Sequence, residues 1–377
     1  MSKLNLIGLP KAELETRLQD LGEKRFHGRQ LFKWLYSVRQ YDFELMTDLS
    51  KELRDKLSDS FEISCLKAED HKISVDSTEK FLFRLVDGKP IETVVIPSQE
   101  EDRRPSTGSG QRPSTSSGQR PSTGSERKTA CISSQSGCAV GCFFCATGTM
   151  GLLRDLTAGE IVGQLMFLRD KYGPTAFSNV VMMGMGEPLL NFTNVIEAIR
   201  IMTDEIGLNI SPKKIVLSTS GITPKIKKLA EEKVGVRLAL SLHAATQQKR
   251  QVIMPIAKTF KLDNLMKAVR QYADSSKLPV TFEYILFDGF NDTRQDIEDL
   301  SRLVRGLRCK INVIAYNPVP GLDFKRPSDD KINWFGRELN QKVKAVTVRQ
   351  SRGRDIEAAC GQLAARKFEK DRVSAQI

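Results

Sequence analysis

The sequence lacks any apolar run long enough to cross a membrane, and its first residues, MSKLNLIGLP, lack the apolar core of a signal peptide. It also lacks the even, well-spread set of cysteines that a secreted disulfide framework requires. There are seven cysteines, and four of them are crowded between Cys131 and Cys145. These absences predict a chain with no membrane segment in a reducing, cytoplasmic setting. Hydrophobic residues make up 40% of the 377 residues, enough for one large domain and a smaller one.

Acidic residues are the scarcer charged type. Asp and Glu number 46 against 58 Lys and Arg, which gives a net charge of +12. Excess positive charge favours a polyanionic partner, most simply nucleic acid, although many basic surfaces are merely solvated. Between Lys24 and Tyr36 basic residues alternate with aromatic ones. The basic residues there fit a phosphate-binding face or a solvated one, and the aromatics fit either base stacking or the core of a small domain.

Three of the crowded cysteines, Cys138, Cys142 and Cys145, have the spacing C-x3-C-x2-C. A tight loop with this spacing can turn three thiolates towards one iron–sulfur cluster, and the lack of a fourth ligand nearby would leave one iron open to a small molecule. The alternatives are a structural zinc site or three buried thiols. Zinc sites usually consist of two separated ligand pairs, and no fourth Cys or His lies close in the sequence. The spacing therefore favours a cluster.

Strand and helix patterns alternate from Thr129 onward. Apolar, β-branched runs indicate buried strands, and the segments between them have helical periodicity. The strand runs cover 180–183, 215–218, 236–241, 280–286 and 311–315. Six βα units with buried parallel strands predict an α/β fold, a partial (βα)6 barrel, with functional residues at the carboxyl ends of its strands.

The rest of the chain consists of segments that differ in composition. Residues 1–60 contain three helical patterns and predict a small helical domain, and residues 61–98 contain two strand patterns around Asp87-Gly88, which predict a β-hairpin. Residues 99–128 form a low-complexity insert that repeats the octapeptide RPSTGSGQ, and its composition predicts a disordered coil. The barrel is expected over residues 129–365, and residues 366–377 are a C-terminal tail.

Six short motifs follow one another along the chain. They are CISSQSGC from Cys131, MMGMGEPLLN from Met182, LSTSG from Leu217, SLHA from Ser241, YNP from Tyr316 and AACGQL from Ala358. With the cysteine spacing, they resemble the radical S-adenosylmethionine (SAM) superfamily and, within it, the RlmN/Cfr family of ribosomal RNA adenine methyltransferases. The resemblance covers nearly the whole chain except the insert. It implies a partial radical SAM barrel with a small N-terminal helical accessory domain that holds RNA and a short β-hairpin extension.

The resemblance also implies the cofactors and their ligands. It assigns one [4Fe-4S] cluster to Cys138, Cys142 and Cys145, and it implies two SAM molecules per turnover. Contacts with SAM are implied for residues at strand ends, namely Gly186, Glu187, Ser218, Ser241, Leu242, His243 and Asn317. Taken singly, His243 fits a core histidine and Asn317 fits a turn residue. Polar strand ends that converge on one rim favour a bound ligand instead.

Three further residues receive catalytic roles from the resemblance. In the family, the cysteine at Cys360 receives a methyl group from SAM, and the cysteine at Cys131 releases the product as a disulfide forms. The glutamate at Glu92 is assigned as the proton acceptor. From the sequence alone, Cys360 fits a buried apolar residue and Glu92 a solvent-facing strand residue.

The expected function is SAM-dependent methylation of adenine C2 in 23S rRNA, with tRNA left open as a second substrate. Expected partners are this RNA and an electron donor such as flavodoxin, and the protein is expected to be a monomer. The alternatives are C8 methylation of the same adenosine, a non-catalytic RNA-binding relative, and a radical SAM enzyme acting on a small molecule. The presence of all five expected functional cysteines argues against the second, and the net charge of +12 argues against the third.

Overall fold

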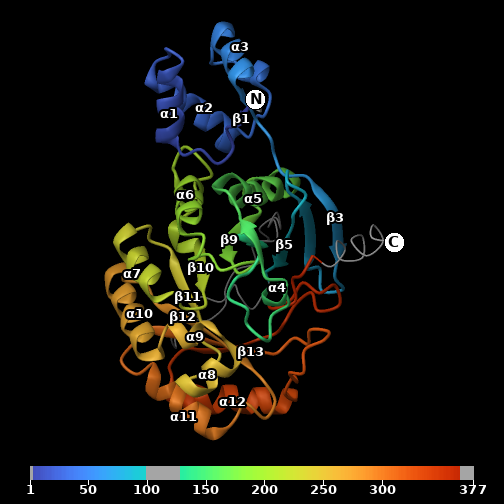
Figure 1. Cartoon of the computed structure of the whole chain (residues 1–377), viewed down its shortest axis with the longest axis vertical. Coiled ribbons are helices and arrows are strands. Elements are labelled where there is room, and N and C mark those ends of the chain that lie inside the picture. Colours follow the sequence, from blue (N-terminus) through green and yellow to red (C-terminus); the bar gives the residue numbers. More distant parts are fainter. Residues whose placement is uncertain (1–2, 99–127, 366–377) are drawn as a thin grey trace, which may run out of the picture.

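The structure is a computed structural model that describes residues 3–98 and 128–365. The expected insert (except Lys128) and the expected C-terminal tail lie outside the described residues. Figure 1 shows the N-terminal helices at one end of the long axis, above a larger body of strands flanked by helices. No helix among the described residues is long and apolar enough to span a lipid bilayer.

The N-terminal part consists of α1 (Lys11–Asp20), α2 (Arg25–Lys33) and α3 (Lys51–Ser60), with a π-helical turn at Trp34–Val38 and a 3-10 turn at Phe43–Leu45. The short parallel strands β1 (Leu4–Asn5) and β2 (Phe61–Glu62) bring its two ends together. Ion pairs fix it to the helices of the larger body: Lys11 lies 2.7 Å from Asp204, and Arg39 lies 2.6 Å from Asp170.

The aromatic residues of this part serve two purposes. Phe32 and Tyr36 are 1% and 0% exposed and pack on each other with ring centroids 4.6 Å apart, so they belong to the core. Phe26 is 53% exposed, beside the exposed side chains of Arg25 and Arg29. The core alternative is therefore correct for Phe32, and Phe26 remains free to contact a partner.

The described residues contain a ten-stranded sheet in the order β14-β13-β12-β11-β10-β9-β6-β5-β4-β3. Its antiparallel edge is formed by β3 (Ala68–Ile73), β4 (Glu79–Arg84) and β5 (Pro90–Pro97), and β5 also pairs antiparallel with β6. The other strands are parallel to one another: β6 (Lys128–Cys131), β9 (Phe177–Met182), β10 (Ile215–Thr219), β11 (Arg237–Ser241), β12 (Val280–Leu286), β13 (Cys309–Ala315) and β14 (Val346–Arg349).

Helices follow the parallel strands in turn: α5 (Ala158–Tyr172), α6 (Phe192–Thr203), α7 (Thr223–Glu232), α10 (Leu262–Ser276), α11 (Arg294–Leu303) and α12 (Asp329–Lys342). This confirms the partial barrel of six βα units, to which β14 adds one more parallel strand. Smaller elements lie in the connections after β6 and β11. They are β7 (Gln135–Gly137), α4 (Ala146–Thr149), β8 (Leu152–Asp155), α8 (Gln247–Ile253) and α9 (Ile256–Thr259), while a 3-10 turn at Pro212–Lys214 precedes β10.

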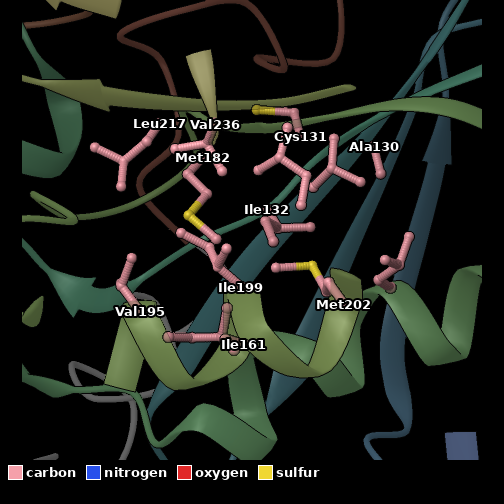
Figure 2. Close-up of a cluster of buried hydrophobic side chains, with 14 of the residues drawn as sticks. Ala130, Cys131, Ile132, Ile161, Met182, Val195, Ile199, Met202, Leu217 and Val236 are labelled. Carbon is pink, nitrogen blue, oxygen red and sulfur yellow. The ribbon is translucent and has the colours of Figure 1, made fainter. Parts of the chain in front are cut away.

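The two faces of the parallel strands differ in chemistry. Figure 2 shows Met182, Leu217 and Ile132 facing Ile161 of α5 and Ile199 of α6, and all of these side chains are buried. Burying each side chain of this size contributes about 1.5–3 kcal/mol. Cys131 comes one residue before Ile132, and Figure 2 shows it pointing away from the helices. The alternation of side chains along a strand therefore places the Cys131 thiol on the barrel's inner face.

Candidate active site

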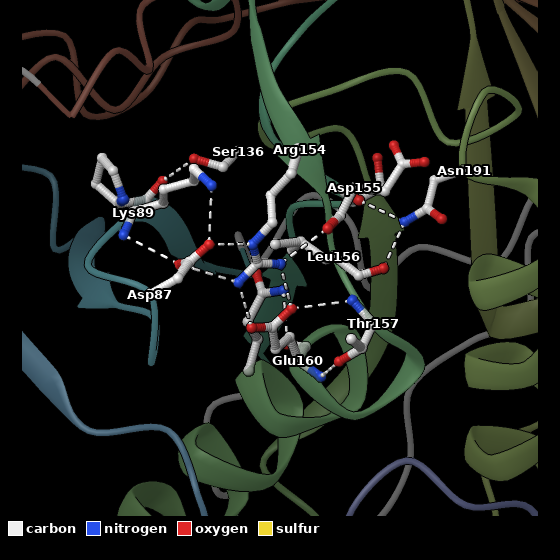
Figure 3. Close-up of polar contacts among 12 residues, drawn as sticks. Asp87, Lys89, Ser136, Arg154, Asp155, Leu156, Thr157, Glu160 and Asn191 are labelled. Carbon is white, nitrogen blue, oxygen red and sulfur yellow. Dashed lines mark hydrogen bonds and ion pairs between the residues drawn. The ribbon is translucent and has the colours of Figure 1, made fainter.

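The loop with three cysteines lies between β7 and α4 and is held from several sides. The backbone N–H of Cys138 donates to Gly151 O at 2.9 Å, and that of Phe143 donates to Ile253 O at 3.1 Å, at the end of α8. Figure 3 shows why the base of this loop is fixed. The Arg154 guanidinium pairs with Asp87 at 2.6 Å and with Glu160 at 2.7 Å, which joins β8 to the hairpin turn and to the start of α5.

The three thiols suit an iron–sulfur cluster. Cys138, Cys142 and Cys145 are all free and partly buried. Burial raises the pKa of Cys138 to about 12, and burial followed by the neighbouring Cys145 and Cys138 thiols raises the pKa of Cys142. Thiols in such surroundings ionise when metal binds them. No three side chains in the described part of the chain are arranged around a single-ion site, whereas a cluster takes each thiolate on a different iron.

The MMGMGEP motif directly follows β9 and packs closely against β7. Gly186 has φ +99°, and a Cβ there would lie 2.5 Å from Cβ of Gln135, so only glycine fits. The Gln135 amide oxygen accepts from Glu187 N at 2.8 Å. Both carboxylate oxygens of Glu187 are engaged, since they accept from Leu189 N at 3.0 Å and from Ser220 N at 2.6 Å. Burial raises the pKa of Glu187, which is 3% exposed.

The other expected SAM contacts lie at the ends of neighbouring strands. The hydroxyls of Ser218 and Ser241 are 3.5 Å apart on β10 and β11. Next along the chain, Leu242 is fully buried, so its contact with a ligand would come from its backbone. Asn317, after β13, donates to Cys360 O at 3.2 Å, and its own amide oxygen has no partner. The structure thus brings Ser218, Ser241, Leu242 and Asn317 to one rim.

His243 has two properties that an ordinary core histidine does not require. It has φ +56°, in the left-handed region that non-glycine residues rarely adopt. Its Nδ1 accepts from Ile285 N at 3.1 Å, so the proton of the neutral ring lies on Nε2. Burial, with Arg250 nearby, lowers its pKa to about 3. His243 therefore presents a neutral N–H donor near the cluster loop, with its ring 5.0 Å from that of Phe144.

Cys131 and Cys360 line one cavity of about 920 Å³, together with Cys145 of the cluster loop. Burial, then the Cys360 thiol, raises the pKa of Cys131 to about 12. Cys360 is exposed to the cavity; enclosure by its walls and then Glu283 raise the pKa of its thiol. The segment with Cys360 is joined to α4, because Ala146 N donates to Gly361 O at 2.7 Å and Thr147 Oγ1 donates to Leu363 O at 2.6 Å.

The strand pattern alone predicts that Glu92 faces solvent, but its side chain is buried. It is also not among the side chains that line this cavity. It is 4% exposed, and its Oε1 lies 3.0 Å from Nζ of Lys80. Its Oε2 accepts from Ala364 N at 3.0 Å, and Lys80 also donates to Glu357 O at 3.1 Å. The Lys80–Glu92 pair therefore contacts the chain on both sides of Cys360, at Glu357 and at Ala364.

Several polar residues at the site were not predicted. Glu283 on β12 is buried beside Ser241 in the strand register; its Oε1 accepts from Asn312 Nδ2 at 2.8 Å and its Oε2 has no partner. A glutamate within an apolar strand run is the signal that could have identified it. Arg349 and Arg352 also line the cavity; unlike Glu283, they are expected from the sequence, since basic residues just before Cys360 suit contacts with RNA phosphates. Arg250, fully buried on α8, carries no such signal in the sequence.

Comparisons with known proteins agree along almost the whole chain. Residues 4–63 match the ribosomal RNA large subunit methyltransferase N-terminal domain family, and residues 132–304 match the radical SAM superfamily. A protein of Cytophaga hutchinsonii named "Probable dual-specificity RNA methyltransferase RlmN" is 43% identical over 364 residues, which cover 96% of this chain and 93% of that protein. A "Dual-specificity RNA methyltransferase RlmN" of Marinobacter nauticus is 39% identical over 381 residues, covering 99% and 95%.

A crystal structure of a radical SAM methyltransferase from Sphaerobacter thermophilus has the same architecture. Its TM-score with this chain is 0.83 at 41% sequence identity, and the match covers 96% of this chain and 99% of that one. The match extends over the N-terminal helices, the hairpin and the barrel.

Proposed function

The chain belongs to the RlmN family of radical SAM RNA methyltransferases, and on that premise we propose that it methylates C2 of an adenine in 23S rRNA, with tRNA as a second substrate. The radical SAM superfamily implies SAM and a [4Fe-4S] cluster as cofactors. The observation that carries the proposal is the position of Cys131 and Cys360 on one cavity beside Cys145. Such a cavity can hold the methylated cysteine, the resolving cysteine and the target base together.

Cys138, Cys142 and Cys145 would hold the cluster. When bound, the cluster and SAM supply a carbon-centred radical, which is needed because C2 of adenine has no lone pair with which to attack a methyl donor. Gly186 and Glu187, the serines Ser218 and Ser241, the backbone of Leu242, the neutral His243 and Asn317 would hold SAM. Two SAM molecules are consumed, because one gives its methyl group to Cys360 and the other gives the radical.

Cys360 would hold the methyl carbon, which would give up one hydrogen atom to the radical that the cofactors supply and then bond to C2 of the base. The one electron left over after this addition would return to the cluster. The family resemblance assigns Glu92, which contacts the Cys360 segment from outside the cavity lining, as the acceptor of the proton that C2 loses as the new bond replaces its C–H bond. Cys131, as a thiolate, would then attack the Cys360 sulfur, and the sulfur–carbon bond would break. The released carbon would take up a proton to become the methyl group, the methylated RNA would leave, and a Cys131–Cys360 disulfide would form. The raised pKa of Cys131 means that its thiol must first lose a proton in the cavity.

The electrons for this chemistry would come from a low-potential donor such as a flavodoxin, and the reducing conditions that keep the free thiols reduced suit the cytoplasm. We propose a monomer, since the residues assigned here to the reaction all come from one chain.

The test is mass spectrometry of nucleosides from 23S rRNA and tRNA after anaerobic reaction with reconstituted protein, SAM and reductant. We expect 2-methyladenosine from rRNA, a second signal from tRNA, and neither from Cys360→Ala. If 8-methyladenosine appears instead, the C8 alternative is correct. If the protein gives no methylated nucleoside although it cleaves SAM, the proposal is wrong.

A further inference from the structure

Arg250 is a buried cation without an anionic partner. Its side chain on α8 is 0% exposed and is the largest fully buried side chain of the described residues. Its hydrogen bonds go to backbone carbonyls, and no carboxylate of the described residues lies within ion-pair distance of it. A buried ion is stable only when an opposite charge or a full set of hydrogen bonds compensates it. The guanidinium of Arg250 has neither, because its Nη1 is buried with no partner at all.

The bonds that Arg250 does make fix it at the ends of two strands. Nε donates to Leu242 O at 3.2 Å, and Nη2 donates to Ser220 O and, at 3.3 Å, to Ser241 O. These carbonyls belong to the connections that follow β10 and β11, where the expected SAM contacts lie. The guanidinium therefore cannot turn towards solvent, where it could meet an anion, without losing its hydrogen bonds to both connections.

Burial lowers the pKa of Arg250 to about 10, and Cys142 and then Glu187, in their charged forms, oppose that shift. Glu187 is already occupied, because both of its oxygens accept backbone N–H bonds. Cys142 is different: as a thiol it has no charge to offer, and it acquires one when metal binds it. The cluster loop is joined to α8 through the Phe143–Ile253 backbone bond, so the helix that carries Arg250 lies against the loop that carries Cys142.

An iron–sulfur cluster held by three thiolates has a net negative charge in its oxidised state and gains one more on reduction. We propose that Arg250 is the buried counter-charge of the cluster, placed beside Cys142, and that it favours the reduced state. This inference rests on the assignment of the cluster to Cys138, Cys142 and Cys145. Arg250 is a positioning residue: it acts on the cluster through charge and hydrogen bonding, two of the factors that set cluster potentials.

Redox titration of the loaded protein, followed by electron paramagnetic resonance, tests the charge directly. We expect Arg250→Gln to shift the midpoint potential of the cluster to a more negative value, both with and without SAM, since a nearby cation stabilises the added electron. Arg250→Lys should stay close to the wild type. The control is Arg169→Gln: Arg169 is also buried with an unpartnered nitrogen, but no cysteine acts on it.

Melting temperatures of the cluster-free and loaded forms give a second measure that does not depend on activity. Loading should raise the melting temperature of the wild type and of Arg169→Gln by equal amounts, and that of Arg250→Gln by clearly less, because only Arg250 gains a partner on loading. Iron and sulfide analysis of each sample shows whether the cluster is present. A wild type that binds no cluster would contradict the function proposed above as well as this role.

Three outcomes would overturn the inference while leaving the proposed function intact. They are an unchanged potential in Arg250→Gln, a shift that appears only when SAM is bound, and equal loss of the cluster in Arg250→Gln and Arg250→Lys. The second outcome would make the SAM carboxylate the partner, and the third would mean that the shape of the side chain matters and its charge does not.

Discussion

Cys131 and Cys360 occupy one cavity but have different assigned roles, so substitution should separate them. Cys360→Ala should bind cluster and SAM and give no methylated RNA, because no thiol receives the methyl group. Cys131→Ala should still methylate Cys360 and generate the radical, and then stop with RNA bound covalently through Cys360. On a denaturing gel, Cys131→Ala should give a slow, nuclease-sensitive band and Cys360→Ala none. Free methylated RNA from Cys360→Ala would show that these roles are assigned wrongly.

The Lys80–Glu92 pair allows a second test, of whether Glu92 is the proton acceptor or only holds the Cys360 segment. Lys80→Met leaves a buried carboxylate uncompensated and should lower the free energy of unfolding by about 3–5 kcal/mol. Glu92→Gln combined with Lys80→Met removes both charges and should recover most of that loss, as measured by chemical denaturation. If Glu92 accepts the proton, the double variant should fold and still load a methyl group on Cys360, yet form no methylated RNA.

Recovery of normal turnover in the double variant would contradict the catalytic role and leave Glu92 as a structural residue. A double variant less stable than Lys80→Met alone would mean that the two charges do not form the compensating pair described here.

The spacing in a short loop is what allowed the sequence to suggest Cys138, Cys142 and Cys145 as cluster ligands, whereas Cys131 and Cys360 were assigned only through the family resemblance. The sequence could not predict Lys80 or Arg250, since each works through contacts that no local sequence pattern shows. Lys80 donates to Glu357 O, 277 residues away, and Arg250 to carbonyls at the ends of separate strands. Glu92 was expected to face solvent on sequence alone, because a single strand pattern does not show that the segment before the C-terminus covers it.

At the scale of elements, β8 is a support for the cluster loop, and Arg154 is its main connection (Figure 3). Its side chain is 25% exposed, so its bidentate pairs with Asp87 and Glu160 are partly shielded from solvent. Arg154→Met should lower the free energy of unfolding by about 1–2 kcal/mol. Arg200→Met is the matched control: Arg200 pairs with Glu232 at 2.7 Å but is 56% exposed, and its loss should be within about 0.5 kcal/mol.

The effect of Arg154 should depend on pH in a defined direction. Hydrogen bonds from Arg154 hold the pKa of Asp87 well below its usual 3.8. The unfolded chain therefore binds a proton at Asp87 at higher pH than the folded chain, and the stabilisation is complete above about pH 5 and declines as the pH falls through about 4. Denaturation curves of wild type and Arg154→Met should approach each other on acidification. A constant difference down to pH 3 would mean that Arg154 acts through packing.

Periodicity in the sequence predicted the strands and helices that have strong patterns, and it failed where elements are short or polar. The hairpin expected around Asp87-Gly88 occurs as β4 and β5. The third antiparallel strand, β3, was missed because its sequence AEDHKI has no apolar face, and most of its residues are exposed. The strand β14 was missed for a similar reason: its four residues alternate between half-buried and exposed positions.

At the scale of the whole molecule, the net charge of +12 and the cavity arginines Arg349 and Arg352 suit a polyanionic substrate. The N-terminal helices contribute exposed basic residues on and beside α2, namely Lys24, Arg25, Arg29 and Lys33. One of them, Arg25, is engaged with Glu15 at 2.6 Å. The remaining three, near the exposed ring of Phe26, have no internal ion pair among the contacts of the described residues and can contact phosphate directly.

Replacing Lys24, Arg29 and Lys33 together by Gln should therefore weaken RNA binding for all sequences tested. The slope of log K against log salt should decrease by about 0.7–0.9 for each phosphate contact that is lost. The control removes three charges from the barrel through Lys213→Gln, Lys214→Gln and Lys227→Gln, all exposed positions beside β10 and on α7. Binding titrations at several salt concentrations compare the two variants. If both variants lose RNA affinity equally, the net charge attracts RNA and α2 has no specific role. If only the α2 variant loses affinity, and its SAM cleavage without RNA is unchanged, the helical part holds RNA and the barrel performs the chemistry.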